Sequence, residues 1–145
     1  MDQDAHIRKA ASTDLVRLVA LISQLSPQPY WRGLLTDSIR CGWTWIAEAD
    51  GTVAGFLAMT DRFFGRPFID LLVVEPDHRR KGYAAALMAM AETQAVGDRV
   101  FVSTNRSNAP MRSLLAARGY VDSGVVHNLD PDDPELILVR FKPLA

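Results

Sequence analysis

Several features are scarce in this sequence, and each absence excludes a class of protein. The 145 residues include one cysteine, Cys41, so no disulfide can form within the chain. No apolar run approaches the roughly 20 residues that a membrane-spanning helix needs. The start of the chain, residues 1–5, is acidic and polar, unlike a secretory signal peptide. We therefore expect a reduced, cytoplasmic protein without a membrane partner.

The charge is nearly balanced, with 16 basic and 17 acidic residues and a net charge of −1. A nucleic-acid-binding domain usually spreads basic residues over one face, so we expect no nucleic-acid partner. His6 and His127 have no Cys, His or carboxylate at metal-ligand spacing, so we expect no metal. With 48% apolar residues the chain can close one core, which predicts a single domain over residues 1–145.

Two helices are predicted near the start of the chain. Apolar residues recur at helical spacing over 15–22, with Ser12 or Thr13 available as the N-cap. A second stripe runs over 31–39 and ends before Gly42, which can take the left-handed conformation of a helix C-terminus. The two helices should form a hairpin-like pair.

A β-hairpin and a buried strand follow. Residues 44–49 and 53–59 are strand-like and flank Asp50-Gly51, a pair typical of the type I′ hairpin turn, which makes these strands antiparallel neighbours. Gly and Pro punctuate residues 61–67, which we expect to form a loop. The run 68–74 is almost wholly apolar, as expected of a central strand covered on both faces.

The remaining segments alternate between helix and strand. We expect a helix over 84–96, a strand over 100–104, a helix that Asn108 caps and Gly119 ends, and strands over 121–129 and 136–141. With a weak opening strand at Ile7-Arg8, the order is β-α-α-β-β-β-α-β-α-β-β. This order predicts a mixed three-layer α/β fold.

A basic turn, Arg79-Arg80-Lys81-Gly82-Tyr83-Ala84, joins the buried strand to the next helix. Unpaired N–H groups and the positive end of the dipole at a helix start favour an anion there. The chain contains neither the Walker pattern nor the dinucleotide pattern of glycines. The alternative interpretation is a solvated basic turn that simply begins an ordinary helix.

Two motifs and the order of elements resemble the GNAT family of N-acetyltransferases. Residues 79–84 fit its Q/R-x-x-G-x-G/A pattern, with Ala84 in place of the commoner glycine. The family's N-x-x-A-x-x-L-Y-x-x-x-G-F/Y signature is matched in spacing by four residues, Asn108, Leu114, Gly119 and Tyr120. The resemblance covers nearly the whole chain. It implies a central mixed sheet of about seven strands flanked by about four helices, and acetyl-CoA as the co-substrate.

The resemblance also assigns residues to the cofactor. In relatives, the fourth strand splays from the fifth, and unpaired main-chain groups there bind the pantetheine arm and the thioester carbonyl. Backbone N–H groups of the basic turn would hold the pyrophosphate, approached closely because glycine has no Cβ. The implied cofactor-binding residues are Val73, Val74, Arg79, Arg80, Lys81, Gly82, Tyr83, Ala84, Asn105 and Asn108.

Asp70 is the single charge in the apolar strand, and we expect it to be the general base. An acceptor ammonium must lose a proton before it attacks the thioester. Some relatives carry Glu or His at this position or at that of Phe68, which shares its face of the strand. Alternatively, Asp70 hydrogen-bonds a buried backbone group or pairs with an arginine. Aromatic residues in apparent loops are the candidates for lining the acceptor site: Tyr30, Phe63 and Phe64.

Leu115 stands where many relatives have the tyrosine that protonates the leaving sulfur, so that acid is missing here. The expected activity is acetyl transfer from acetyl-CoA to a primary amine, of a small molecule rather than of a protein. Protein or peptide N-terminal acetylation is the second enzymatic alternative. The non-enzymatic alternative is an acyl-CoA-binding sensor, and a homodimer formed through strand edges also stays open.

Overall fold

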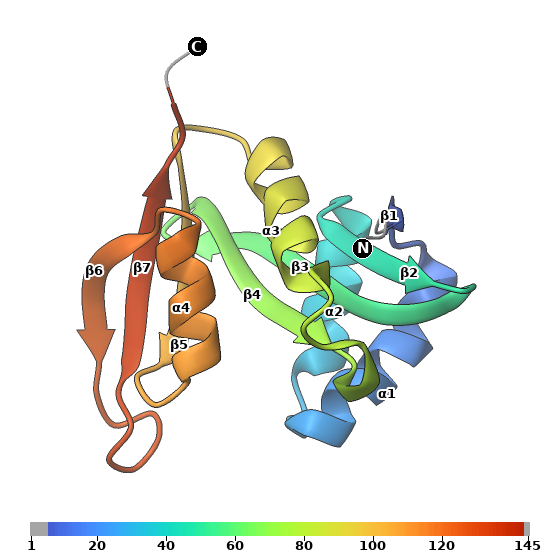
Figure 1. Ribbon diagram of the computed structural model, residues 1–145, viewed down its shortest axis with the longest axis horizontal. Coiled ribbons are helices and arrows are strands. Elements are labelled where there is room, and N and C mark those ends of the chain that lie inside the picture. Colours follow the sequence, from blue (N-terminus) through green and yellow to red (C-terminus); the bar gives the residue numbers. More distant parts are fainter. Residues whose placement is uncertain (1–5, 144–145) are drawn as a thin grey trace. The chain divides into compact units, whose positions relative to one another are not determined.

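A computed structural model describes residues 6–143 of the chain (Figure 1). Within that range, one seven-stranded sheet has the order β1-β2-β3-β4-β5-β7-β6. The strands and α-helices are β1 (His6–Lys9), α1 (Leu15–Leu25), α2 (Trp31–Arg40), β2 (Thr44–Ala49), β3 (Thr52–Phe63), β4 (Arg66–Val74), α3 (Tyr83–Gln94), β5 (Arg99–Asn105), α4 (Ala109–Ala117), β6 (Val121–Val126) and β7 (Glu135–Phe141). The predicted mixed α/β fold is confirmed.

The chain divides into two compact units. Among the described residues, the first comprises residues 6–60 together with Asp70–Gln94, and the second comprises Asp61–Ile69 together with residues 95–143. The prediction of a single domain over residues 1–145 stays a prediction. No helix within the described range is long and apolar enough to cross a membrane.

The first unit packs helices on both faces of its strands (Figure 1). Apolar residues of α1 and α2 form a cluster with one set of strand residues: Ile46, Phe56, Ala58, Leu71 and Val73. The alternate strand residues face the other way, as the period of two in a strand requires, and α3 lies against β2 and β1 on that side. This packing buries the apolar side chains that the helical and strand patterns predict to face the core.

The predicted type I′ hairpin is confirmed. Asp50 and Gly51 both have positive φ, at 53° and 75°, and the strands they join are antiparallel. The register shifts between Ala47 and Glu48, where Ala47 pairs with Gly55 and Glu48 with Val53. β3 therefore carries a bulge at Ala54.

The predicted cap of the first helix is wrong. Ser12 and Thr13 lie in a short 3₁₀ turn (Ser12–Asp14), and α1 begins after Asp14. The carboxylate of Asp14 accepts a 2.7 Å hydrogen bond from the N–H of Ala11, and it also binds Arg8. The charged side chain therefore binds back to the start of the 3₁₀ turn, and no side chain caps α1.

The predicted loop over 61–67 is also wrong, because β3 continues to Phe63 and β4 begins at Arg66. Phe64 and Gly65, with φ of 53° and 74°, make a second two-residue turn. This hairpin end belongs to the second unit, where the ring of Phe63 lies 5.0 Å from that of Phe68 and 4.9 Å from that of Phe101. Aromatic packing thus holds together a segment whose Gly and Pro suggested an open loop.

The second unit is an antiparallel arrangement of β5, β7 and β6, with α4 joining β5 to β6. β4 pairs with β5 in parallel at Phe68–Phe101 and Ile69–Val102. Asn108 caps α4 as predicted, since its side-chain oxygen accepts from the N–H of Met111. The left-handed Gly119, at φ 87°, follows the helix. Leu115 is fully buried in this unit.

Candidate functional site

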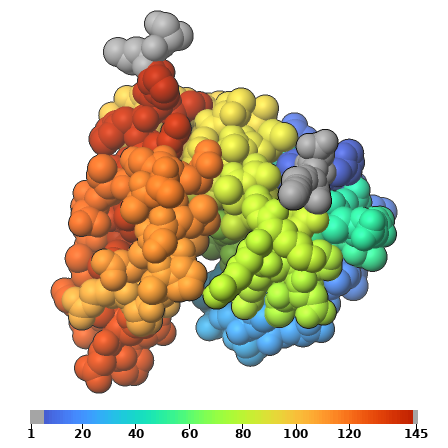
Figure 2. Space-filling model, in the orientation of Figure 1, coloured from blue at the N-terminus to red at the C-terminus, as the bar shows by residue number. Residues whose placement is uncertain are grey.

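The basic turn between β4 and α3 lies at the surface of the first unit (Figure 2). Arg79, Arg80, Lys81 and Gly82 are exposed, and Tyr83 is buried at the first position of α3. Arg80 and Gly82 both have positive φ, at 63° and 88°. Two left-handed residues within three positions bend the chain sharply into the helix, so the turn wraps around the N-terminus of α3.

Hydrogen bonds from the neighbouring backbone fix the start of this turn. The carboxylate of Glu75 accepts a 2.9 Å hydrogen bond from the N–H of Asp77, and it lies 3.3 Å from Nδ1 of His78. Nε of Arg79 donates to the carbonyl of Val74 at 3.2 Å. His78 is therefore bound to Glu75, and its ring lies 6.0 Å from that of Tyr83.

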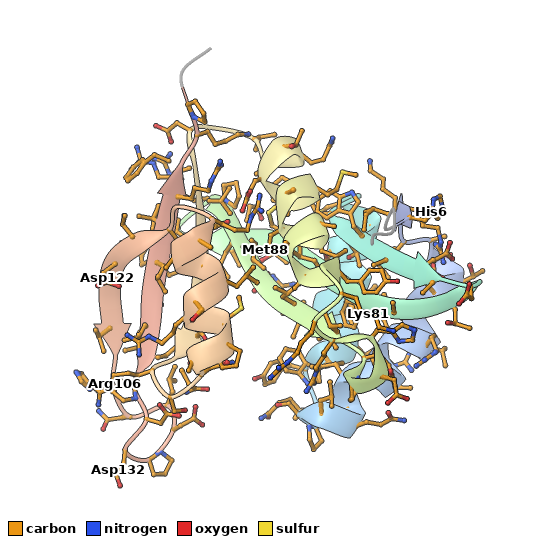
Figure 3. All side chains as sticks on the ribbon, viewed as in Figure 1. His6, Lys81, Met88, Arg106, Asp122 and Asp132 are labelled. Carbon is orange, nitrogen blue, oxygen red and sulfur yellow. The ribbon has the colours of Figure 1, made fainter. Side chains whose placement is uncertain are left out.

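The geometry of this turn suits a diphosphate. The first N–H groups of α3 have no acceptor within the helix, while Gly82 already accepts from the N–H of Ala86 and so begins the helical pattern. A Cβ built at Gly82 would meet no protein atom within 4 Å. The three residues before Gly82, which include Lys81 (Figure 3), are basic and exposed, so a phosphate group can approach the backbone closely.

Asp70 is held by a residue of the neighbouring strand. Oγ1 of Thr60 donates a 2.7 Å hydrogen bond to Oδ2 of Asp70. Thr60 is only 6% exposed, and Asp70 is half-buried on the same face of β4 as Phe68. This hydrogen bond orients the carboxylate.

The candidate acceptor residues lie in different surroundings. Tyr30 precedes α2, is 56% exposed and makes an edge contact of 4.7 Å with Trp31. Phe64 occupies the β3–β4 turn and is 87% exposed, whereas Phe63 belongs to the aromatic packing described above. Tyr30 lies in the first unit and the two phenylalanines in the second. Their role toward an acceptor stays a prediction.

The asparagines assigned to the cofactor have structural contacts in the second unit. The side-chain nitrogen of Asn105 donates to Oδ2 of Asp130 at 2.9 Å and to the carbonyl of Asp133. Asn108 caps α4. These bonds fix the β6–β7 connection and the start of α4, and any contact with the cofactor remains a prediction.

Two residues of the site, Thr60 and Glu75, are absent from the sequence-based predictions. Thr60 lies in a strand-like run, and only the antiparallel return of β4 brings Asp70 to it. Glu75 could have been noticed, because it precedes Pro76 at the start of a short 3₁₀ turn (Pro76–His78), a common place for a capping acid. Within residues 6–143, no group of three or more His, Cys, Asp and Glu side chains could hold a metal ion.

Comparison with solved structures finds similar proteins over nearly the whole chain. An acetyltransferase of the GNAT family from Bacillus cereus is 32% identical, covers 98% of this chain and 100% of its own, and has a TM-score of 0.88. The ribosomal-protein-S18-alanine N-acetyltransferase of Escherichia coli is 17% identical, with coverages of 98% and 96% and a TM-score of 0.77. YncA of Salmonella typhimurium, solved with its cofactor acetyl-CoA, is 14% identical, with coverages of 99% and 96% and a TM-score of 0.81.

The family is shown by the sequence as well. No curated protein matches the chain. The family model "Acetyltransferase (GNAT) family", however, matches residues 16–120, which include both the basic turn and Asp70. The chain therefore belongs to the GNAT family of acetyltransferases, enzymes that use acetyl-CoA as co-substrate.

Proposed function

We propose that this enzyme transfers the acetyl group of acetyl-CoA directly to a primary amine of a small molecule, with Asp70 as the general base. The observation that carries the proposal is the Thr60–Asp70 hydrogen bond on the strand that leads into the basic turn. A carboxylate in an otherwise apolar strand is costly to bury, so a hydroxyl that orients it favours a chemical role.

The basic turn would bind the pyrophosphate of acetyl-CoA. Its exposed cations, Arg79, Arg80 and Lys81, supply charge, and the N–H groups from Gly82 to Ala84 supply donors at a helix N-terminus. When bound, acetyl-CoA supplies an activated acyl group whose thiolate leaves without a covalent enzyme intermediate. The chain's own contribution is then mainly to position the two reactants, which can lower a barrier by about 7–11 kcal/mol.

The spacing along β4 supports Asp70 as the base. Asp70 lies three residues before Val73, about 10 Å along an extended strand. That length leaves room for an amine beside the carboxylate and a carbonyl beside the Val73–Val74 peptide. Asp70 would take the proton from the attacking ammonium, either directly or through one water, because the neutral amine is the nucleophile.

Leu115 supports the choice of a small-molecule acceptor. The resemblance places a tyrosine here in the relatives that acetylate ribosomal-protein N-termini, whereas this side chain is apolar and fully buried. No proton can come from it to the leaving sulfur. The loss is tolerable because a thiolate is a good leaving group and general acid catalysis typically contributes about 10²–10⁴-fold.

The test is calorimetric titration with acetyl-CoA, followed by a panel of amines with release of free CoA thiol as the readout. We expect selective binding of acetyl-CoA over ATP and turnover of small primary amines. Turnover of peptide N-termini alone would favour the second enzymatic alternative. Tight binding without turnover of any amine would favour the acyl-CoA sensor.

A cytoplasmic location and a homodimer stay predictions.

The role of Asp70 is tested separately. Asp70→Asn should lower kcat and alter its pH profile while acetyl-CoA affinity stays unchanged, because the amide keeps the shape but cannot accept a proton. An unchanged kcat would remove Asp70 from the reaction without affecting the assignment of the cofactor.

A further inference from the structure

Gly55 on β3 is an unusual glycine in this structure. Six of the nine glycines have positive φ, which explains their lack of a side chain, but Gly33, Gly55 and Gly124 do not. At Gly33 and Gly124 a Cβ would find open space within 4 Å. At Gly55 it would lie 2.5 Å from the carbonyl oxygen of Val73 and 3.2 Å from Cα of Val74. Only at Gly55, among these three, does the backbone of another strand exclude a side chain.

This contact shows how the Val73–Val74 peptide is oriented. A Cβ on a strand stands roughly perpendicular to the sheet, so it meets a neighbouring main chain only where that chain leaves the plane of the ladder. The carbonyl of Val73 is thus turned over the face of Gly55. In a trans peptide the next N–H points the opposite way, so the N–H of Val74 is directed away from Gly55.

Neighbouring contacts hold the two strands in this arrangement. The N–H of Glu75 donates to the carbonyl of Ala54 at 2.8 Å, which ties the end of β4 to the bulge of β3. Nε of Arg79 binds the carbonyl of Val74, which belongs to the same peptide as the Glu75 N–H. The chain is therefore held directly after the peptide over Gly55, and a methyl group at Gly55 could be admitted only by moving that held backbone.

We propose that Gly55 is a positioning residue for the acyl-carrying arm of acetyl-CoA. Because Gly55 lacks a Cβ, the Val73 carbonyl can turn toward β3. The N–H of Val74 then points at the arm. A backbone donor there can stabilise negative charge on the thioester oxygen. This inference rests on the proposed function, in which the Val73–Val74 peptide contacts that arm. Gly55 itself touches neither substrate.

The experiment compares Gly55→Ala with Gly124→Ala, a strand glycine where the added methyl meets nothing. Each protein is titrated with acetyl-CoA and with adenosine 3′,5′-diphosphate, the nucleotide part of the cofactor, which does not reach β4. We expect Gly55→Ala to lose about tenfold or more in acetyl-CoA affinity and less than about twofold in nucleotide affinity. Gly124→Ala should match the wild type with both ligands.

The other possible results of these titrations separate a failure of the inference from a failure of the proposed function. Wild-type affinity for acetyl-CoA in Gly55→Ala overturns the inference alone, and so does an equal loss for both ligands, which would indicate a merely structural role. If the wild type fails to bind acetyl-CoA, the proposed function fails and the inference falls with it.

If Gly55→Ala does not fold, amide hydrogen exchange of the wild type replaces it. We expect the Val74 amide to exchange rapidly in the free protein and to become protected by acetyl-CoA but not by the nucleotide. Slow exchange in the free protein would overturn the orientation on which the inference depends.

Discussion

The hydroxyl of Thr60 on β3 donates a 2.7 Å hydrogen bond to the carboxylate of Asp70 on β4. The two residues are ten positions apart and meet because the β3–β4 hairpin returns the chain beside itself. Thr60 is buried, so water competes weakly for its hydroxyl. The bond orients the carboxylate, and a general base must be oriented toward the proton that it removes.

Thr60→Val should lower kcat about tenfold or less while leaving the affinity for acetyl-CoA unchanged. Valine keeps the shape but removes the donor, so the carboxylate is less well oriented. Steady-state kinetics with the best amine of the panel measure the effect, and a kcat equal to that of the wild type would contradict the coupling.

Gly82→Val should weaken acetyl-CoA binding by at least about tenfold, because the side chain enters the space in which the pyrophosphate is expected. Gly51→Val is the matched control, since Gly51 also has positive φ and open surroundings but lies in the β2–β3 turn. Both variants should lose similar thermal stability from backbone strain. Equal acetyl-CoA affinity of the two, measured by calorimetry, would refute the assignment of the turn.

Tyr30→Ala should raise the KM for the amine acceptor several-fold and leave the KM for acetyl-CoA unchanged. The ring is more than half exposed and makes an edge contact with Trp31, so its loss should cost little stability. Bisubstrate kinetics with the best amine of the panel separate the two constants. A rise in the KM for acetyl-CoA instead would show that Tyr30 does not line the acceptor site.

Asp14→Asn should lower the free energy of unfolding by about 1 kcal/mol at pH 7, a figure reduced for the partial exposure of the pair. Arg8 donates two hydrogen bonds of 2.9 Å to Asp14, which is the main cause that lowers the pKa of this carboxyl. A lowered folded-state pKa contributes stability that is present above about pH 4 and is lost as the pH falls further.

Urea unfolding at pH 7 and pH 3 checks this sign. The difference in stability between wild type and Asp14→Asn should shrink at the lower pH. Asp37→Asn, which removes an exposed pair with Arg40 at 3.7 Å, should change stability by less than about 0.5 kcal/mol. A gap for Asp14→Asn that is constant with pH would show that its charge does not matter.

Local patterns in the sequence predicted many of the elements, and they failed where a distant contact decided the conformation. The turns at Asp50-Gly51 and after α4 follow from residues that accept positive φ. The same reasoning missed the tight turn at Phe64 and Gly65, because its strands are held by rings from β3, β4 and β5. It also missed Asp14, whose capping bond is reinforced by Arg8 from β1.

The sequence by itself determined the order of elements, the basic turn over residues 79–84 and the family resemblance, because helix starts and tight turns are encoded by adjacent residues. Only the tertiary structure decided that Thr60 meets Asp70 and that Gly55 must lack a side chain. Both depend on how the end of one strand lies against another. Strand register and departures from the sheet plane arise from packing across the sheet, which no local pattern of residues specifies.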